Sequence, residues 1–131
     1  MARILLVDDD PIVTQALSHI LTQAHHQVSI AYDGEHATEM LRTFKPHVLI
    51  TDILMPKKSG TTLIAEVKRD YPKVEIIAIS GGGCSDPLGY LDLSEMLGAA
   101  ISFEKPVDHD ALLMAIDLLV SAKIPLSEPA M

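Results

Sequence analysis

The feature that most constrains the fold is an alternation of five short apolar runs with longer amphipathic segments. The short runs have the length of β-strands, are rich in valine and isoleucine, and several are apolar at nearly every position. Strands have this composition when both faces of a parallel sheet are covered by other elements. The runs are Arg3–Val7, Gln27–Ala31, His47–Thr51, Val74–Ile79 and Ala100–Glu104.

The segments between these runs repeat their apolar residues at helical spacing. Helices are expected over Pro11–Ala24, Glu35–Phe44, Thr61–Arg69 and Asp108–Ala122. Asp10 followed by proline, Asp33 and Asp108 are typical N-caps for three of them. The stretch Gly81–Gly98 opens with three glycines and predicts a loop that moves easily, followed by a short helix.

This order predicts an α/β fold in which a five-stranded parallel sheet is doubly wound, with helices on both faces. The chain has 131 residues, of which 48% are hydrophobic, enough for one domain with its own core. We expect that domain to cover residues 1–122. Residues 123–131 contain two prolines and are expected to form a short frayed tail.

Charge and cysteine content exclude several classes of protein. The formal net charge of -8 argues against direct binding to nucleic acid and to anionic membranes. Cys84 is the only cysteine, so no internal disulfide can form, which suits a reducing compartment. The chain has neither a signal-peptide layout nor an apolar run of roughly 18 residues. These features predict a soluble cytoplasmic protein.

Polar side chains follow four of the predicted strands. Asp8, Asp9 and Asp10 follow the first strand, and Asp52 follows the third. Ser80 and Lys105 follow the fourth and fifth strands. Because the carboxyl ends of parallel strands share one edge of a sheet, we expect these groups to converge there, with Asp10 serving only as a helix cap.

Such a constellation predicts phosphoryl chemistry. Carboxylates that are held close together repel one another, and a divalent cation relieves that repulsion. Ligands that are all oxygen favour a hard ion such as Mg²⁺. The metal, an ammonium group and a hydroxyl group together can surround a transferred phosphoryl group, and Asp52 is a plausible nucleophile for it.

Four motifs occur in the order expected of a known family. They are VDDD at 7–10, LITDILMPKKSG at 49–60, AIS at 78–80 and EKP at 104–106. With these motifs the chain resembles the receiver domain of two-component response regulators, of the stand-alone type, over residue 3 to about residue 121. The resemblance implies a flavodoxin-like (βα)₅ fold.

The resemblance also implies a role for each residue at the strand ends. Asp52 would accept a phosphoryl group from a histidine kinase or a histidine phosphotransfer protein. Asp8, Asp9 and Asp52, with the backbone carbonyl of Leu54, would hold Mg²⁺. The phosphoryl-binding and switching groups implied are Ser80, Gly81 and Lys105, and Pro106 would have a structural role after a cis peptide bond.

A protein of this kind is a signalling module rather than an enzyme, and its signal passes to a separate downstream protein. No oligomeric state is predicted. The family's switch aromatic commonly lies three residues before the lysine, where this chain has Ser102. Strand alternation directs the neighbouring Phe103 to the opposite face of the sheet.

Two alternatives remain open. The pair Asp8 and Asp10 resembles the nucleophile and acid of haloacid-dehalogenase-type phosphatases, in which Asp8 would attack the substrate. That assignment leaves Asp52 without a role and requires a cap domain for which the chain has no room. The second alternative is a degenerate receiver that is bound permanently to a partner.

Overall fold

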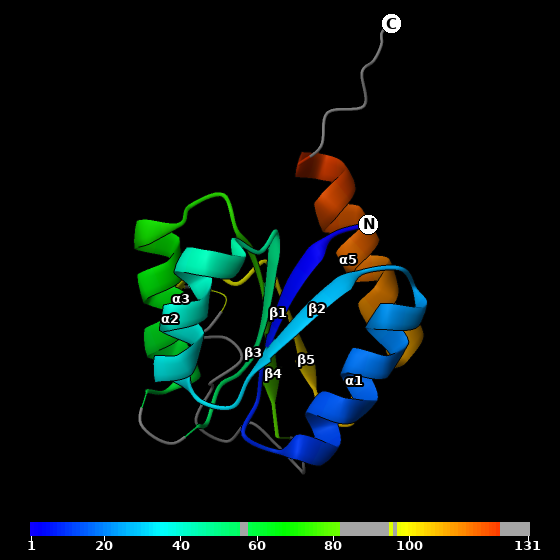
Figure 1. The fold of residues 1–131 in the computed structure, drawn as a ribbon, viewed down its shortest axis with the longest axis horizontal. Helices are drawn as coiled ribbons and strands as arrows, with labels where there is room; N and C mark the ends of the chain where they lie inside the picture. Colours follow the sequence, from blue (N-terminus) through cyan, green and yellow to red (C-terminus); the bar gives the residue numbers. More distant parts are fainter. Residues whose placement is uncertain (56–57, 82–94, 96, 124–131) are drawn as a thin grey trace, which may run out of the picture.

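The computed structural model describes residues 1–55, 58–81, 95 and 97–123 (Figure 1). Most of the predicted loop and short helix within Gly81–Gly98, and the tail from residue 124, lie outside this part of the chain. The elements are β1 (Arg3–Val7), α1 (Pro11–Gln23), β2 (Gln27–Ala31), α2 (Gly34–Phe44), β3 (Val48–Asp52), α3 (Gly60–Asp70), β4 (Glu75–Ser80), β5 (Ile101–Glu104) and α5 (His109–Lys123).

The predicted parallel sheet is confirmed. All five strands pair in parallel in the order β2-β1-β3-β4-β5. The strand order therefore reverses at β1, whose neighbours β2 and β3 lie on its two sides. In a doubly wound sheet the carboxyl ends of the strands beside this point form the usual binding crevice.

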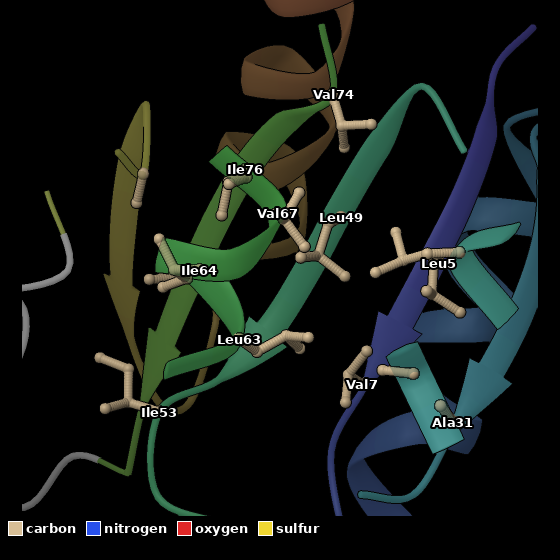
Figure 2. Packing of buried hydrophobic residues seen from close by; sticks show 14 residues of the cluster. Leu5, Val7, Ala31, Leu49, Ile53, Leu63, Ile64, Val67, Val74 and Ile76 are labelled. Carbon is tan, nitrogen blue, oxygen red and sulfur yellow. The ribbon is translucent and has the colours of Figure 1, made fainter. Parts of the chain in front are cut away.

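Helices cover both faces of the sheet, with α2 and α3 on one side and α1 and α5 on the other (Figure 1), and each face has its own apolar core. Leu5 and Val7 point toward α2 and α3, whereas Ile4 and Leu6 point toward α1 and α5. This alternation is the two-residue period of a strand, and both phases are apolar because both faces are covered. Figure 2 shows the first core, in which Leu63, Ile64 and Val67 of α3 pack over β3 and β4.

The three predicted N-caps are confirmed. Each aspartate side chain accepts a hydrogen bond from an amide in the first turn of its helix, which satisfies one of the orphan donors there. The amide nitrogens of Ile12, His36 and Ala111 lie 2.9, 2.8 and 3.1 Å from carboxylate oxygens of Asp10, Asp33 and Asp108. None of the helices in the described ranges has the length and apolar character needed to cross a membrane.

Two histidines hold the start of β1. The Ala2 amide donates to Nδ1 of His26 at 3.1 Å, and the Arg3 amide donates to Nδ1 of His47 at 2.9 Å. Burial, together with the positive charge of the N-terminus, lowers the pKa of His26 below its ordinary value. A protonated imidazole cannot accept this hydrogen bond, because both of its nitrogens then carry a proton.

The lowered pKa of His26 predicts acid sensitivity. The unfolded chain binds a proton to His26 more readily than the folded one, so its contribution to stability is complete above pH 6.5 and is lost as the pH falls below it. His26→Asn is expected to give a flatter profile of unfolding free energy between pH 7 and pH 5, measured by urea denaturation. His19→Asn, at an exposed position of α1, should leave the wild-type slope unchanged. Equal slopes for wild type and His26→Asn would contradict the prediction.

Candidate functional site

Three aspartates from two strands meet at the carboxyl edge of the sheet. Asp8 and Asp9 follow β1, and Asp52 ends β3 next to it. One carboxylate oxygen from each lies within 4.8 Å of the other two. Asp8 and Asp52 are buried, at 1% and 5% exposure, while Asp9 is exposed. The structure thus brings together the acidic residues that the strand-end pattern singled out, with Asp9 on the side open to solvent.

Lys105 is the cation that balances this cluster. Its Nζ lies 2.8 Å from Oδ2 of Asp8 and 3.4 Å from Oδ2 of Asp52. Burial alone lowers the pKa of the Lys105 ammonium, but its contacts with the two carboxylates outweigh burial and raise the pKa. The Lys105 amide donates to the carbonyl of Ser80 at 2.8 Å, so the end of β4 aligns the residue that follows β5.

The buried position of Asp52 disfavours its charged form. Burial and the nearby charge of Asp8 raise the pKa of Asp52 to about 6, against the opposing effects of Lys105 and of the Ile53 amide. That amide donates to Oδ1 of Asp52 at 2.8 Å and fixes the carboxylate plane. Sequence reasoning did not find the contribution of Ile53, since a backbone amide is available whatever the residue type.

The donor set of the cluster fits a hard divalent cation. Oδ1 of Asp8 accepts the Asp10 amide at 2.9 Å, which orients the carboxylate. Oδ2 of Asp8 is buried without a hydrogen bond, and its 2.8 Å contact with Lys105 is an ion pair without hydrogen-bond alignment. A buried oxygen with free acceptor capacity beside two further carboxylates is the arrangement that Mg²⁺ can satisfy.

The remaining predicted residues lie at the same edge of the sheet. Ser80 is buried at the end of β4, and Gly81 after it is exposed. Leu54 is 56% exposed, and a metal-binding role for its carbonyl stays a prediction. The peptide bond between Lys105 and Pro106 is cis, as predicted.

The position of the missing switch aromatic carries a polar contact instead. The Ser102 hydroxyl donates to Oε2 of Glu95 at 2.7 Å. Phe103 packs with the core on the α1 and α5 side of the sheet, so the predicted opposition of these two neighbours is confirmed. A hydrogen-bonded pair of serine and glutamate therefore occupies the position where the family commonly has an aromatic ring.

Comparison with known proteins decides the family. Residues 4–117 match the family described as "Response regulator receiver domain", which covers most of the chain. The chain belongs to this receiver family. The receiver is similar to the "Transcriptional regulatory protein GlrR" of Escherichia coli (strain K12), with 30% identity over 128 residues, which are 97% of this chain and 28% of that protein. It is also similar to the "Response regulator PleD" of Caulobacter vibrioides, with 32% identity over 132 residues, covering 97% of this chain and 28% of that protein.

The receiver spans about a quarter to a half of the length of such curated relatives; for the "Transcriptional regulatory protein DegU" of Brevibacillus brevis the share is 49%. That this receiver acts alone therefore stays a prediction. Solved receivers share its fold over nearly their whole length. One from Bermanella marisrubri has 36% identity and a TM-score of 0.80, covering 91% of this chain and 98% of that one. A CheY-like receiver from Methanospirillum hungatei has 25% identity and a TM-score of 0.85, covering 94% and 96%.

Proposed function

We propose that this receiver is a phosphorylation switch whose acceptor is Asp52. A carboxylate oxygen of Asp52 would attack the phosphorus of a phosphohistidine on a histidine kinase or a phosphotransfer protein. The new O–P bond replaces the P–N bond, whose electron pair leaves with the imidazole. The observation that carries this proposal is the placement of Asp52, which lies buried at the end of β3 between two acidic neighbours and Lys105. With a pKa of about 6, most of Asp52 is ionised and nucleophilic at pH 7.

Mg²⁺ would be held by Asp8, Asp9 and Asp52, with the carbonyl of Leu54 as a further ligand. When bound, the metal neutralises charge on the phosphoryl oxygens. The chain supplies the remaining contacts: the Lys105 ammonium pairs with a phosphoryl oxygen, and the Ser80 hydroxyl and Gly81 amide donate to others. Lys105 then exchanges its carboxylate partners for the phosphoryl group.

The consequence of phosphorylation is a change of protein contacts. Ser80 ends β4, and Lys105 directly follows the neighbouring strand β5. A backbone hydrogen bond of 2.8 Å joins the two residues, so a movement of one displaces the other. We infer that a downstream protein in the cytoplasm reads this change. Local charge at the site then biases a two-state surface, as in other phosphorylation switches.

Chemical labelling tests the acceptor. The protein is incubated with acetyl phosphate and Mg²⁺, and the phosphorylated residue is mapped by mass spectrometry after reductive trapping. A single adduct on Asp52 is expected. An adduct on Asp8, or turnover of phosphomonoesters, would overturn the proposal in favour of a phosphatase. A folded, Mg²⁺-binding protein that takes no label would indicate the degenerate receiver.

An apolar groove beside the site supports a protein as phosphodonor. It has a volume of about 370 Å³ and lies between α1 and the segment that follows β5. Ile12 on its wall is 77% exposed, although isoleucine is usually buried. The residues lining the groove are Ile12, Val13, Ala16, Leu17, Lys105, Pro106, Val107 and His109.

Removing the apolar surface of this groove should slow transfer from a protein donor alone. We expect Ile12→Ser to reduce the rate of phosphorylation by a purified phosphotransfer protein about tenfold, the effect of losing roughly 1.4 kcal/mol of contact. The rate with acetyl phosphate should stay within about twofold of wild type. Leu118→Ser, at another exposed apolar position, serves as the control. Equal rates with the protein donor for Ile12→Ser and wild type would contradict this role.

A further inference from the structure

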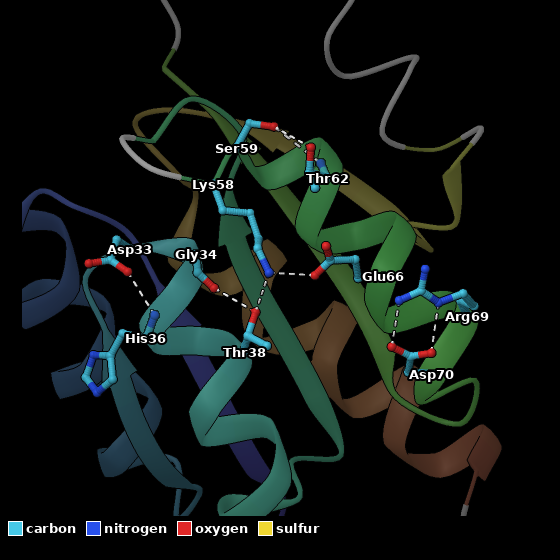
Figure 3. Close-up of polar contacts among 10 residues, drawn as sticks. All are labelled: Asp33, Gly34, His36, Thr38, Lys58, Ser59, Thr62, Glu66, Arg69 and Asp70. Carbon is cyan, nitrogen blue, oxygen red and sulfur yellow. Dashed lines mark hydrogen bonds and ion pairs between the residues drawn. The ribbon is translucent and has the colours of Figure 1, made fainter.

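Lys58, which lies two residues before the start of α3, contacts both α2 and α3 (Figure 3). Its Nζ donates to Oε1 of Glu66 in α3 at 2.7 Å and to Oγ1 of Thr38 in α2 at 2.8 Å. The Thr38 hydroxyl in turn donates to the carbonyl of Gly34 in the first turn of α2, at 2.9 Å. We call Lys58, Thr38 and Glu66 the Lys58 bridge.

The bridge is partly shielded from water. The side chains of Lys58 and Glu66 are 20% and 32% exposed. The neighbouring pair of Arg69 and Asp70 on α3 is 71% and 49% exposed and joins two adjacent residues of one helix (Figure 3). Exposed pairs contribute little, whereas a shielded pair with a second hydrogen bond holds its geometry.

Backbone packing joins the start of α3 to the end of β3. The Gly60 amide donates to the carbonyl of Ile53 at 2.7 Å. A side chain at Gly60 would collide with the backbone of Asp52, and one at Gly34 would collide with the backbone of Lys58. Gly60 thus packs directly on the end of β3, and Lys58 packs on the start of α2.

Ile53, whose carbonyl accepts the Gly60 amide, lies between Asp52 and Leu54. Metal ligands bind best when the residues behind them fix their position, because ordering a free segment costs free energy at the moment of binding. We propose that Lys58 is a positioning residue: through Thr38 and Glu66 it fixes the start of α3, and through the Gly60–Ile53 hydrogen bond it holds Asp52 and Leu54 in the conformation that binds Mg²⁺. Lys58 has no contact with the carboxylate cluster among the interactions of the described residues, so it acts through the backbone of Gly60 and Ile53.

The sign of the effect separates positioning from simple electrostatics. Removing a positive charge near an acidic site should tighten the binding of a cation. Positioning predicts the opposite, that Lys58→Met weakens Mg²⁺ binding. We expect the Kd to rise roughly fivefold, less than the 10- to 100-fold typical when a partner of a ligating side chain is removed, because one of several ligands is affected. Lys58→Arg keeps the charge and should stay within about twofold of wild type.

The test is a Mg²⁺ titration of the full chain, followed by NMR, with the thermal midpoint measured in EDTA and in saturating Mg²⁺. Lys58→Met should raise the Kd and reduce the upward shift of the midpoint that Mg²⁺ causes. Arg69→Met removes the exposed pair of the same helix and should change neither quantity. A purely structural bridge would instead lower both midpoints equally and leave the Kd unchanged, which would overturn the proposal, as would a tighter Kd for Lys58→Met.

Thr38→Val provides a second variant without a change of charge. It removes one arm of the bridge at nearly constant volume, and we expect it to raise the Kd about twofold. If Lys58→Met does not fold, Thr38→Val and Glu66→Gln take its place, and an unchanged Kd in both would overturn the inference.

The inference rests on the proposed function only for the metal site, and the two can fail separately. Labelling of Asp52 with an unchanged Kd in the variants would refute the bridge alone. Binding of Mg²⁺ without labelling of the wild type would refute the proposed function and leave the bridge standing. A wild type that binds no Mg²⁺ would refute both.

Discussion

Lys105→Met is expected to lower the unfolding free energy of the metal-free protein by about 3 kcal/mol at pH 7. The substitution removes the cation that lies 2.8 Å from Asp8 and 3.4 Å from Asp52, while both carboxylates stay buried. Breaking a buried pair leaves uncompensated charge, which costs more than the pair itself contributes. Lys105 is itself 21% exposed, so water can enter the space it leaves, and we place the loss at the lower end of the range for buried pairs.

Saturating Mg²⁺ should recover most of this loss. A divalent cation among Asp8, Asp9 and Asp52 compensates the same carboxylates that Lys105 compensates in its absence, so stability and metal binding are linked. Urea denaturation of wild type and Lys105→Met, each in EDTA and in Mg²⁺, measures both effects. Lys73→Met removes an exposed lysine and should be near neutral in both conditions. A deficit for Lys105→Met that is the same with and without Mg²⁺ would contradict a metal site at these carboxylates.

The grouping of polar residues at the strand ends could be predicted from the sequence because it depends on topology alone. Once parallel strands are inferred, Asp8, Asp52, Ser80 and Lys105 must share one edge, whatever the details of packing. The structure places all four there. The exact ends of the strands were harder to predict. The strands β3 and β4 each begin and end one residue later than predicted. Apolar runs mark the buried body of a strand, but the ladder continues through polar Asp52 and Ser80, which pair with Ile79 and Glu104.

Contacts between side chains of different elements could not be predicted from the sequence. Nothing in the sequence near Lys58 indicates that its ammonium reaches Thr38, twenty positions earlier, because that contact depends on how α2 and α3 lie against the sheet. The roles of His26 and His47 at the start of β1 depend likewise on strand register. The type of a residue indicates which contacts its side chain can make. Which partner it contacts depends on how the elements pack together, and the spacing of apolar residues in one sequence does not reveal this.

Asp52→Asn should abolish labelling by acetyl phosphate and at the same time stabilise the metal-free protein. An amide is not a nucleophile toward phosphorus at neutral pH, so the labelling rate should fall by at least about 100-fold. The gain in stability follows from burial, which together with the charge of Asp8 raises the pKa of Asp52 from 3.8 to about 6. Ionisation of Asp52 is therefore less favourable in the folded state than in the unfolded chain. Above pH 6, where Asp52 is ionised in both states, this difference lowers the unfolding free energy by its full amount. Asparagine has the same shape, can accept the Ile53 amide, and carries no charge.

Because the pKa of Asp52 is higher in the folded protein than in the unfolded chain, the gain in stability of Asp52→Asn must depend on pH in a defined direction. A difference of about two pKa units, which already includes the opposing effect of Lys105, corresponds to roughly 3 kcal/mol, and we expect Asp52→Asn to gain about 2 to 3 kcal/mol of unfolding free energy at pH 7. Between pH 6 and pH 4 the folded wild type takes up a proton at Asp52 before the unfolded chain does, so the gain should shrink and vanish near pH 4. Urea denaturation in EDTA across this range measures it, with Asp110→Asn on the exposed start of α5 as a flat control. A variant less stable than wild type at pH 7, or a gain that grows in acid, would show that the buried carboxylate is compensated within the folded protein and would remove the electrostatic reason for a cation there.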